Sequence, residues 1–156
     1  MLQNQNSISM EEYKIAPFMI GTMRMGQWGI RMKESEIEEF IEGCIALGLM
    51  DFDHADIYGS YTTEADFGAV LRKRPDLRDQ MRITTKCGIK LVSENRPEHH
   101  TKSYDLTKDH IKQSVENSLL ALHTDYIDTL LLHRPDYLLN PHEIAASFTA
   151  LKKEGK

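Results

Sequence analysis

The feature of this sequence that most restricts its fold is a fourfold alternation between short apolar runs and segments with helical periodicity. The runs are rich in β-branched and aromatic residues, and they predict strands over 18–23, 49–53, 81–86 and 127–132. A segment with the period of a helix follows each run. Strands and helices that alternate in this way form parallel sheets joined by helical crossovers, so the sequence predicts an α/β fold.

The first two expected helices are marked by apolar spacing and by their ends. Ser35 and Glu38 have the spacing of a capping box. Gly48 is expected to stop the helix that follows, whose buried face is predicted to contain Ile37, Phe40, Ile41, Cys44 and Ile45. A second helix is expected from Glu64 to Lys73, before Pro75, with Phe67, Val70 and Leu71 inward.

The third and fourth helices are predicted mainly from their N-caps. Thr107 is expected to cap a helix that carries an apolar stripe of Ile111, Val115, Leu119 and Leu122. Asn140, Pro141 and Glu143 fit the N-cap, N1 and N3 positions of the last helix. Residues 93–103 have no period and little apolar content, and are expected to form a long loop.

The length of 156 residues indicates how many such units the chain can supply. A TIM (β/α)₈ barrel needs about 250 residues, so the expected fold is the first four βα units, a half-barrel. We expect one domain over 1–156, with residues 1–14 flexible or forming an N-terminal hairpin. An open four-stranded parallel sheet is the alternative, and it would leave two strand edges exposed to other chains.

Charge and composition exclude several partners. The formal net charge is −5, and the basic residues are scattered, so neither nucleic acid nor an anionic membrane is an expected partner. No run reaches the length of a membrane span, and the N-terminus does not resemble a signal peptide, so a cytoplasmic location is expected. Cys44 and Cys87 are expected to be two reduced thiols.

Three ionisable residues come at the carboxyl ends of predicted strands. Asp53, Lys86 and His133 each follow an apolar run, and Tyr58 lies five residues after Asp53. The carboxyl ends of parallel strands share one rim, where α/β proteins build their sites, so these four side chains are expected to face one cavity.

Such a group is suited to protonating a carbonyl oxygen. A tyrosine hydroxyl is a weak acid at neutral pH, and a nearby ammonium such as Lys86 would stabilise its ionised form. Asp53 could hold that ammonium, and His133 could donate a hydrogen bond to a substrate oxygen. No side chain supplies hydride, so the chemistry requires a nicotinamide cofactor.

Three segments in this order resemble the aldo-keto reductase superfamily: Phe52–Gly59 (FDHADIYG), Thr84–Gly88 (TTKCG) and Tyr126–Asp136 (YIDTLLLHRPD). The resemblance extends from about Ile15 to Lys156. It implies a catalytic set of Asp53, Tyr58, Lys86 and His133, with Tyr58 as the general acid. It also implies cofactor contacts by Gly21, Thr22, Met23 and Asp53, and a substrate-bordering role for Trp28. His54 stands where many members have threonine.

The resemblance also implies a function and its requirements. We expect NADPH-dependent reduction of a small aldehyde or ketone, provided that a homo-oligomer or a separate C-terminal half completes the barrel. The alternative is a truncated or non-catalytic fragment or binding subunit that self-associates.

A metal site is the other interpretation of the polar residues, using Asp53, His54 and Asp56 with His99 and His100. Adjacent residues of a strand point to opposite faces, which separates Asp53 from His54. No metal is therefore expected.

Overall fold

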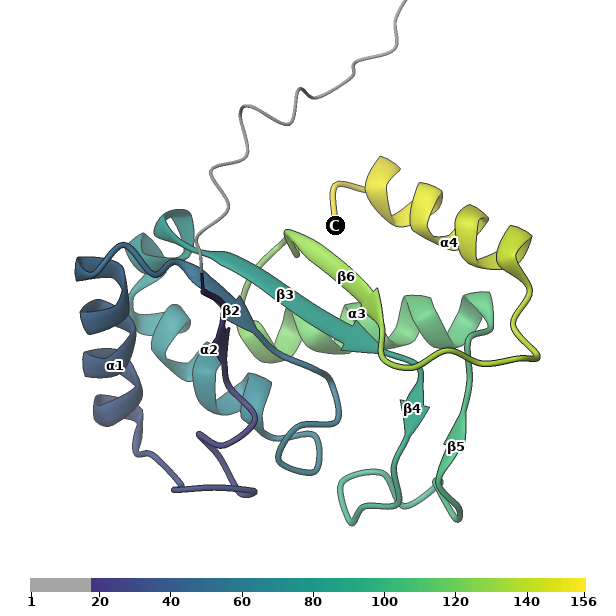
Figure 1. Cartoon of the computed structure of the whole chain (residues 1–156), viewed down its shortest axis with the longest axis horizontal. Coiled ribbons are helices and arrows are strands. Elements are labelled where there is room, and N and C mark those ends of the chain that lie inside the picture. The colour runs from purple at the N-terminus through teal and green to yellow at the C-terminus, as the bar shows by residue number, and fades with distance from the viewer. Residues whose placement is uncertain (1–17) are drawn as a thin grey trace, which may run out of the picture.

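A computed structural model describes residues 18–156, and the expectation for residues 1–14 lies outside this part of the chain. Its main sheet has four parallel strands in the order β1-β2-β3-β6, as Figure 1 shows. They are β1 (Ile20–Gly21), β2 (Asp51–Asp53), β3 (Arg82–Cys87) and β6 (Thr129–Leu132). The α/β fold with a parallel sheet is confirmed, and the sheet forms part of a barrel.

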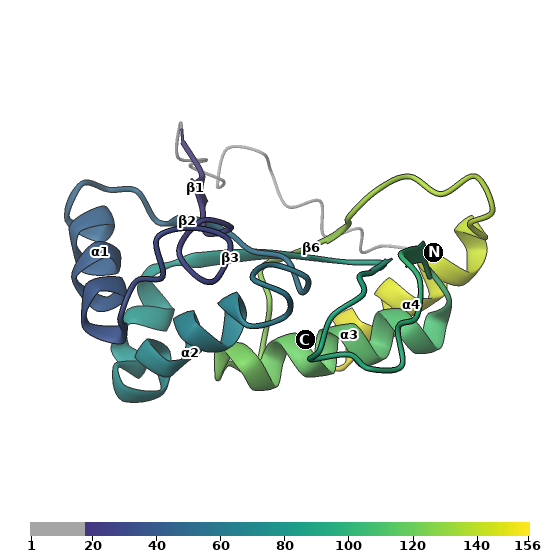
Figure 2. The ribbon, with the colours of Figure 1, turned by 90° about the horizontal axis from the view of Figure 1, so that it is seen from below.

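All four helices cover one face of this sheet, as seen in Figure 2. They are α1 (Glu34–Ala46), α2 (Thr63–Lys73), α3 (Lys108–Leu122) and α4 (Pro141–Lys153), and a 3₁₀ helix, η1 (Pro75–Gln80), follows α2. Phe52 and Ile83 point from the sheet into the core beneath α1 and α2 and are completely buried. A second apolar cluster lies under α3 and α4. Among the described residues, no helix is long and apolar enough to cross a membrane.

The opposite, inner face of the sheet carries ion pairs. Asp51 pairs with Arg82, and the Asp53 carboxylate lies 2.7 Å from the Lys86 ammonium. Side chains alternate between the faces of a strand, so the same strands present an apolar face to the helices and charged groups to the inside. This alternation places Asp53 and Lys86 on the side where a closed barrel has its interior.

Three of the predicted helix starts are close to the observed ones. The Thr107 hydroxyl accepts from His110 N, and the Asn140 side chain accepts from His142 N, so the caps of α3 and α4 are confirmed. The apolar stripes predicted for α2 and α3 are buried. These helices combine a polar N-cap or a proline boundary with a regular apolar period, which is why the sequence predicts them well.

The capping box predicted for α1 is wrong by two residues. The helix begins at Glu34, and the N-cap is Lys33, whose backbone N–H donates to the Glu36 carboxylate at 2.6 Å. Glutamates at both 36 and 38 allow either register, and the helix adopts the earlier one. Phe40, which was expected to point inward, remains 39% exposed.

The predicted loop over 93–103 is flanked by two short strands that the sequence does not indicate. β4 (Ile89–Lys90) and β5 (Ser103–Tyr104) form an antiparallel hairpin that extends from the end of β3. Strands of two residues are too short to show alternation, so no period marks them. Cys44 and Cys87 are buried free thiols, as expected.

Candidate active site

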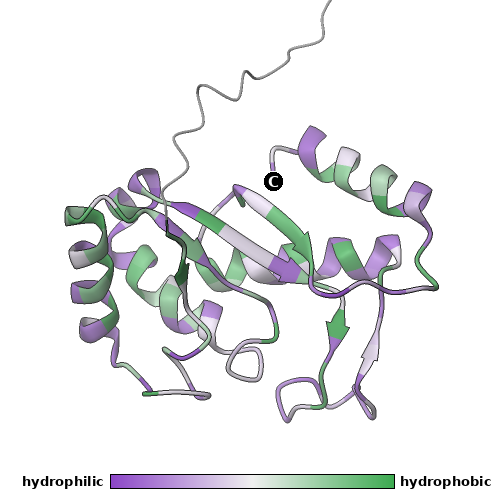
Figure 3. Cartoon of the chain, viewed as in Figure 1, coloured by the Kyte–Doolittle hydropathy of each residue, from purple (hydrophilic) through white to green (hydrophobic). Residues whose placement is uncertain are grey.

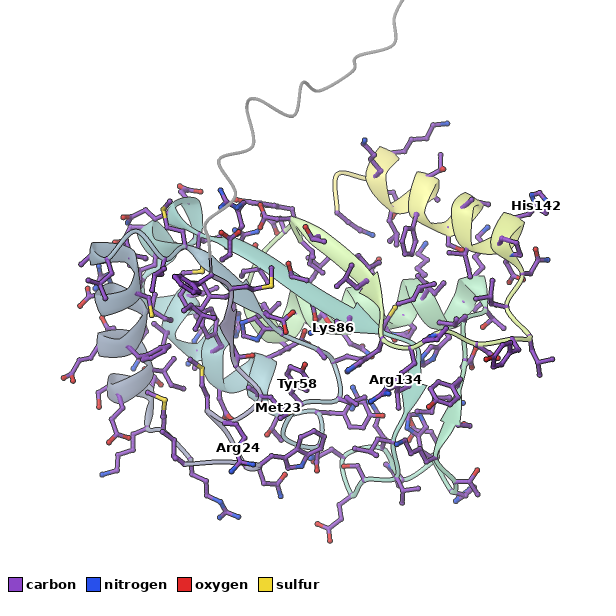
Figure 4. All side chains as sticks on the ribbon, viewed as in Figure 1. Met23, Arg24, Tyr58, Lys86, Arg134 and His142 are labelled. Carbon is purple, nitrogen blue, oxygen red and sulfur yellow. The ribbon has the colours of Figure 1, made fainter. Side chains whose placement is uncertain are left out.

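The four residues predicted to meet at the rim do lie together. The Lys86 ammonium is 2.7 Å from the Asp53 carboxylate and donates a hydrogen bond to the Tyr58 hydroxyl oxygen at 3.1 Å. The rings of Tyr58 and His133 are 5.8 Å apart and nearly perpendicular. Figure 4 shows Tyr58 and Lys86 side by side near the carboxyl end of the strands.

Lys86 is held by three acceptors. Besides Asp53 and Tyr58, its ammonium donates to the peptide oxygen of His54 at 2.7 Å. A lysine has three N–H donors, so all of them are used, which offsets the cost of removing a largely buried charge from water. The ammonium is therefore fixed in position directly beside the phenol.

His54 supports this arrangement from the helix side of the sheet. The Thr22 hydroxyl donates to the peptide oxygen of Asp53 at 2.9 Å, and His54 Nδ1 lies 3.0 Å from the same hydroxyl oxygen. Since the single hydroxyl proton is already used, Nδ1 must carry the proton and donate to Thr22. Burial, and secondarily the charge of Lys86, lower the pKa of His54 to about 3, so the ring is neutral.

Thr22 is consequently separated from the rim. Its side chain is completely buried and bonded inside the chain, so its hydroxyl does not face the surface where the expected cofactor contacts lie. Gly21 and Met23 are both exposed at the end of β1. No described atom lies within 4 Å of the position that a Cβ on Gly21 would occupy. The end of β1, which pairs with Asp53, is therefore an open surface.

His133 is anchored at the end of β6, where its backbone N–H donates to the Cys87 oxygen at 2.8 Å. Burial, then the charges of Lys86 and Arg134, lower the pKa of its imidazole. A neutral imidazole has one N–H donor and one acceptor. Its Nδ1 is buried and has no hydrogen-bond partner among residues 18–156.

Trp28 borders the same space from the β1–α1 loop. Its ring centroid is 6.4 Å from that of Tyr58, and its indole N–H donates to the Ser60 hydroxyl at 3.2 Å. The indole ring of Trp28 therefore lies beside the phenol ring of Tyr58.

The residues of the alternative metal interpretation are not gathered at the rim. His54 points to the helix side, and His99 contacts Tyr61 and the Leu91 oxygen through Nδ1. Within the described part of the chain, no three His, Cys, Asp or Glu side chains are placed to hold a metal ion.

The sequence interpretation missed a buried pair of carboxyl groups on the helix side, Asp56 and Glu64. Burial, and secondarily Glu64, raise the pKa of Asp56 to about 8. Burial also raises the pKa of Glu64, although the Thr85 and Ser118 hydroxyls oppose that shift. Glu64 falls in the first turn of α2, where acidic residues are common, so its burial had no visible signal.

Comparison with known proteins agrees with this geometry. The model of the aldo/keto reductase family matches residues 17–156. The chain belongs to the aldo/keto reductase family. It is 46% identical over 146 residues to the uncharacterized oxidoreductase YcsN of Bacillus subtilis, covering 94% of this chain and 48% of that protein. It is 38% identical to a 6-dehydroglucose reductase of Agrobacterium fabrum, covering 94% and 49%.

A solved aldo-keto reductase from Bacillus halodurans, in its holo form, matches with a TM-score of 0.71 and 28% identity. That match covers 88% of this chain and 42% of the solved chain. This aldo/keto reductase chain thus spans about half the length of the curated relatives it matches. Its four parallel strands correspond to part of the (β/α)₈ barrel of the solved aldo-keto reductases.

Proposed function

We propose that this chain provides the catalytic half of an NADPH-dependent reductase of small aldehydes or ketones, active once a second half-barrel completes the fold. The observation that carries the proposal is the hydrogen bond from the Lys86 ammonium to the Tyr58 hydroxyl, beside Asp53 and His133.

Each rim residue has a role that follows from its contacts. Tyr58 gives its proton to the carbonyl oxygen, and Lys86 stabilises the phenolate that remains. Asp53 holds Lys86 in place. His133 is neutral and donates a hydrogen bond to the same carbonyl oxygen, which stabilises the charge that develops there.

The cofactor supplies the hydride when it is bound. Gly21, Met23 and Asp53 are the residues of this chain that would face it, because they surround the open surface at the end of β1. Trp28 borders the carbonyl substrate through its contact with Tyr58. Relatives named oxidoreductase and 6-dehydroglucose reductase support a carbonyl substrate. The free thiols Cys44 and Cys87 suit a cytoplasmic location.

The test is a fluorescence titration with NADPH, followed by a measurement of NADPH consumption with a panel of short aldehydes and ketones. We expect saturable binding and consumption that depends on the carbonyl compound. Binding without consumption by any carbonyl compound would contradict the proposal and favour the non-catalytic binding subunit.

A further inference from the structure

We infer that the His54 imidazole is a positioning group for the proposed proton transfer. Acting through Thr22, it holds the backbone that fixes the Lys86 ammonium beside the Tyr58 hydroxyl. This inference rests on the proposed function for its effect on catalysis, but its main test follows the ammonium itself and does not depend on turnover.

The backbone at Asp53 and His54 determines where the Lys86 ammonium lies. Two of its three acceptors come from these neighbouring residues: the Asp53 carboxylate at 2.7 Å and the His54 peptide oxygen at 2.7 Å. The third acceptor is the hydroxyl of Tyr58, the group that would react. An ammonium has three N–H donors, so the two acceptors outside Tyr58 orient it. A shift of residues 53 and 54 would therefore move the ammonium relative to the phenol.

Thr22 holds this backbone from the neighbouring strand. Its peptide N–H and its hydroxyl both donate to the Asp53 peptide oxygen, at 3.0 Å and 2.9 Å, so both acceptor positions of that oxygen are used. A threonine hydroxyl can rotate and donate in another direction. The N–H of His54 Nδ1, which lies 3.0 Å from the hydroxyl oxygen, occupies one of its lone pairs and keeps the hydroxyl proton directed at Asp53.

The imidazole of His54 is itself fixed in the helix-side core. It is completely buried and meets the Phe67 ring of α2 edge-on, with the ring centroids 4.5 Å apart. Figure 3 shows hydrophobic residues along α2 between its hydrophilic ends. A ring that is closely packed against such a helix keeps one orientation, so the direction from Nδ1 to Thr22 is constant.

The second ring nitrogen of His54 argues against a role in stability alone. Nε2 is buried and has no hydrogen-bond partner among residues 18–156. A buried polar atom without a partner is costly, and an apolar side chain of similar size would fill the same space without that cost. The donor at Nδ1 therefore distinguishes histidine from an apolar residue at this position.

The first experiment is NMR spectroscopy of the chain labelled with ¹⁵N. Burial, and secondarily the charge of Lys86, lower the pKa of His54 to about 3, so the ring is neutral at about pH 6. A neutral imidazole carries one proton, and its protonated and unprotonated nitrogens have different ¹⁵N shifts. We expect His54 to carry the proton on Nδ1. Its resonances are identified by their loss in His54→Asn.

The same spectra report on the Lys86 ammonium. When all three N–H groups of a lysine have acceptors, their protons exchange slowly with water and should give a separate signal, which exposed lysines lack. Lys86→Arg identifies this signal, because it keeps the positive charge but removes the lysine resonance.

Two matched pairs of variants test the two hydrogen bonds. Asparagine places its amide N–H₂ where His54 has Nδ1, whereas glutamine places it nearer to Nε2. His54→Asn should therefore keep the Lys86 signal, and His54→Gln should lose it through exchange with water. Thr22→Ser retains the hydroxyl and should keep the signal, whereas Thr22→Val removes the hydroxyl and should lose the signal.

A control separates a weakened core from a displaced ammonium. Val70 of α2 is 1% exposed and belongs to the same core cluster as Phe67, but it makes no hydrogen bond through its side chain. Val70→Ala should lower the Tm and leave the Lys86 signal in place. His142→Ala, at an exposed position of α4, should change neither the Tm nor the signal.

Turnover provides the second readout. His54→Gln and Thr22→Val should lower the rate of NADPH consumption by up to about 10²-fold, because a displacement of about 1 Å at the reacting groups has an effect of that size. The affinity for NADPH, measured by fluorescence titration, should remain near that of the wild type.

Three results would overturn the inference: a His54 ring protonated on Nε2, a wild type without a separate Lys86 signal, or a signal that survives in His54→Gln and Thr22→Val. Equal loss of the signal in Val70→Ala would also overturn it. A wild type that shows the expected signals but never consumes NADPH would contradict the proposed function alone.

Discussion

The Lys86 ammonium, at the end of β3, donates a hydrogen bond into the oxygen of Tyr58, a residue of the loop after β2. Because the phenol oxygen accepts a hydrogen bond from the ammonium, the phenol O–H remains free to donate to another acceptor. The ammonium also remains next to the oxygen when that proton leaves. The position of Lys86 therefore suits the Tyr58 phenol, a weak acid, to proton transfer.

Replacing Tyr58 by phenylalanine should remove carbonyl reduction while NADPH binding stays close to that of the wild type. The change deletes one oxygen, which is the proton donor, and a positioned general acid contributes about 10²–10⁴-fold to a rate. The measurement is a comparison of turnover with a fluorescence titration of NADPH. Tyr104→Phe, in the exposed hairpin strand β5, is the control and should retain full turnover. Loss of cofactor binding in Tyr58→Phe would show that Tyr58 is not simply the acid.

Replacing Lys86 by methionine should also suppress turnover, and it should lower the stability of the fold. The change leaves the phenolate without its cation and Asp53 without its partner, and breaking a largely buried ion pair costs about 3–5 kcal/mol. The unfolding temperature and the turnover rate should therefore both fall. Lys90→Met is the matched control, because Lys90 is more exposed and its carboxylate partner Asp105 lies 3.7 Å away. A pair of that kind contributes no more than about 1 kcal/mol.

Replacement by alanine should have opposite effects on stability at two glycines of the helices. A Cβ on Gly68 of α2 would lie 1.9 Å from the Ala121 oxygen of α3, so Gly68→Ala should push the two helices apart and lower the Tm. Gly43 of α1 has no described atom within 4 Å of the same position. Gly43→Ala should therefore raise stability by up to about 1 kcal/mol through helix propensity. Equal effects of the two changes would refute the close approach of α2 and α3.

Asp56 should make stability depend on pH. Burial raises its pKa to about 8 in the folded chain, while an unfolded aspartate titrates near 4. Between these values the folded state keeps a proton that the unfolded state releases, so this group's contribution to stability is full below about pH 4 and is lost as the pH rises towards 8.

Asp56→Asn removes that titration, so its Tm should fall less than the wild-type Tm between about pH 5 and pH 8. Asp79→Asn, at an exposed position of η1, is the control and should keep the wild-type slope. The prediction fails if Asp56→Asn and the wild type lose stability in parallel over this range.

Arg78 is a structural residue that lysine should not replace. Its guanidinium donates to Asp128, Thr124 and the oxygens of Met81 and Tyr126, and it lies 3.8 Å from the centre of the Tyr126 ring. An ammonium cannot reproduce this planar set of donors. Arg78→Lys should therefore lower the Tm almost as much as Arg78→Met, as measured by thermal unfolding.

The sequence was most informative where two signals coincide. The caps of α3 and α4 pair a polar residue with an apolar period, and both were predicted correctly. The meeting of Asp53, Lys86 and His133 followed from strand ends alone, because parallel strands place their carboxyl ends on one side. Tyr58 could be included because only five residues separate it from Asp53.

Other features depend on contacts between distant segments and had no local signal. The hydrogen bonds from Thr22 to Asp53 and from His54 to Thr22 form only when β1 and β2 lie side by side. The burial of Asp56 and Glu64 depends on the packing of α3 over the β2–α2 loop, which no pattern within either segment indicates. The register of α1 was missed because two glutamates offer equivalent caps.

The ion pairs of Asp51 with Arg82 and of Asp53 with Lys86 make the inner face of the sheet charged, whereas its helix-covered face is apolar. Charged groups are costly to remove from water, so the inner face resists burial against other proteins. Aggregation through this face is therefore disfavoured while the barrel is still open.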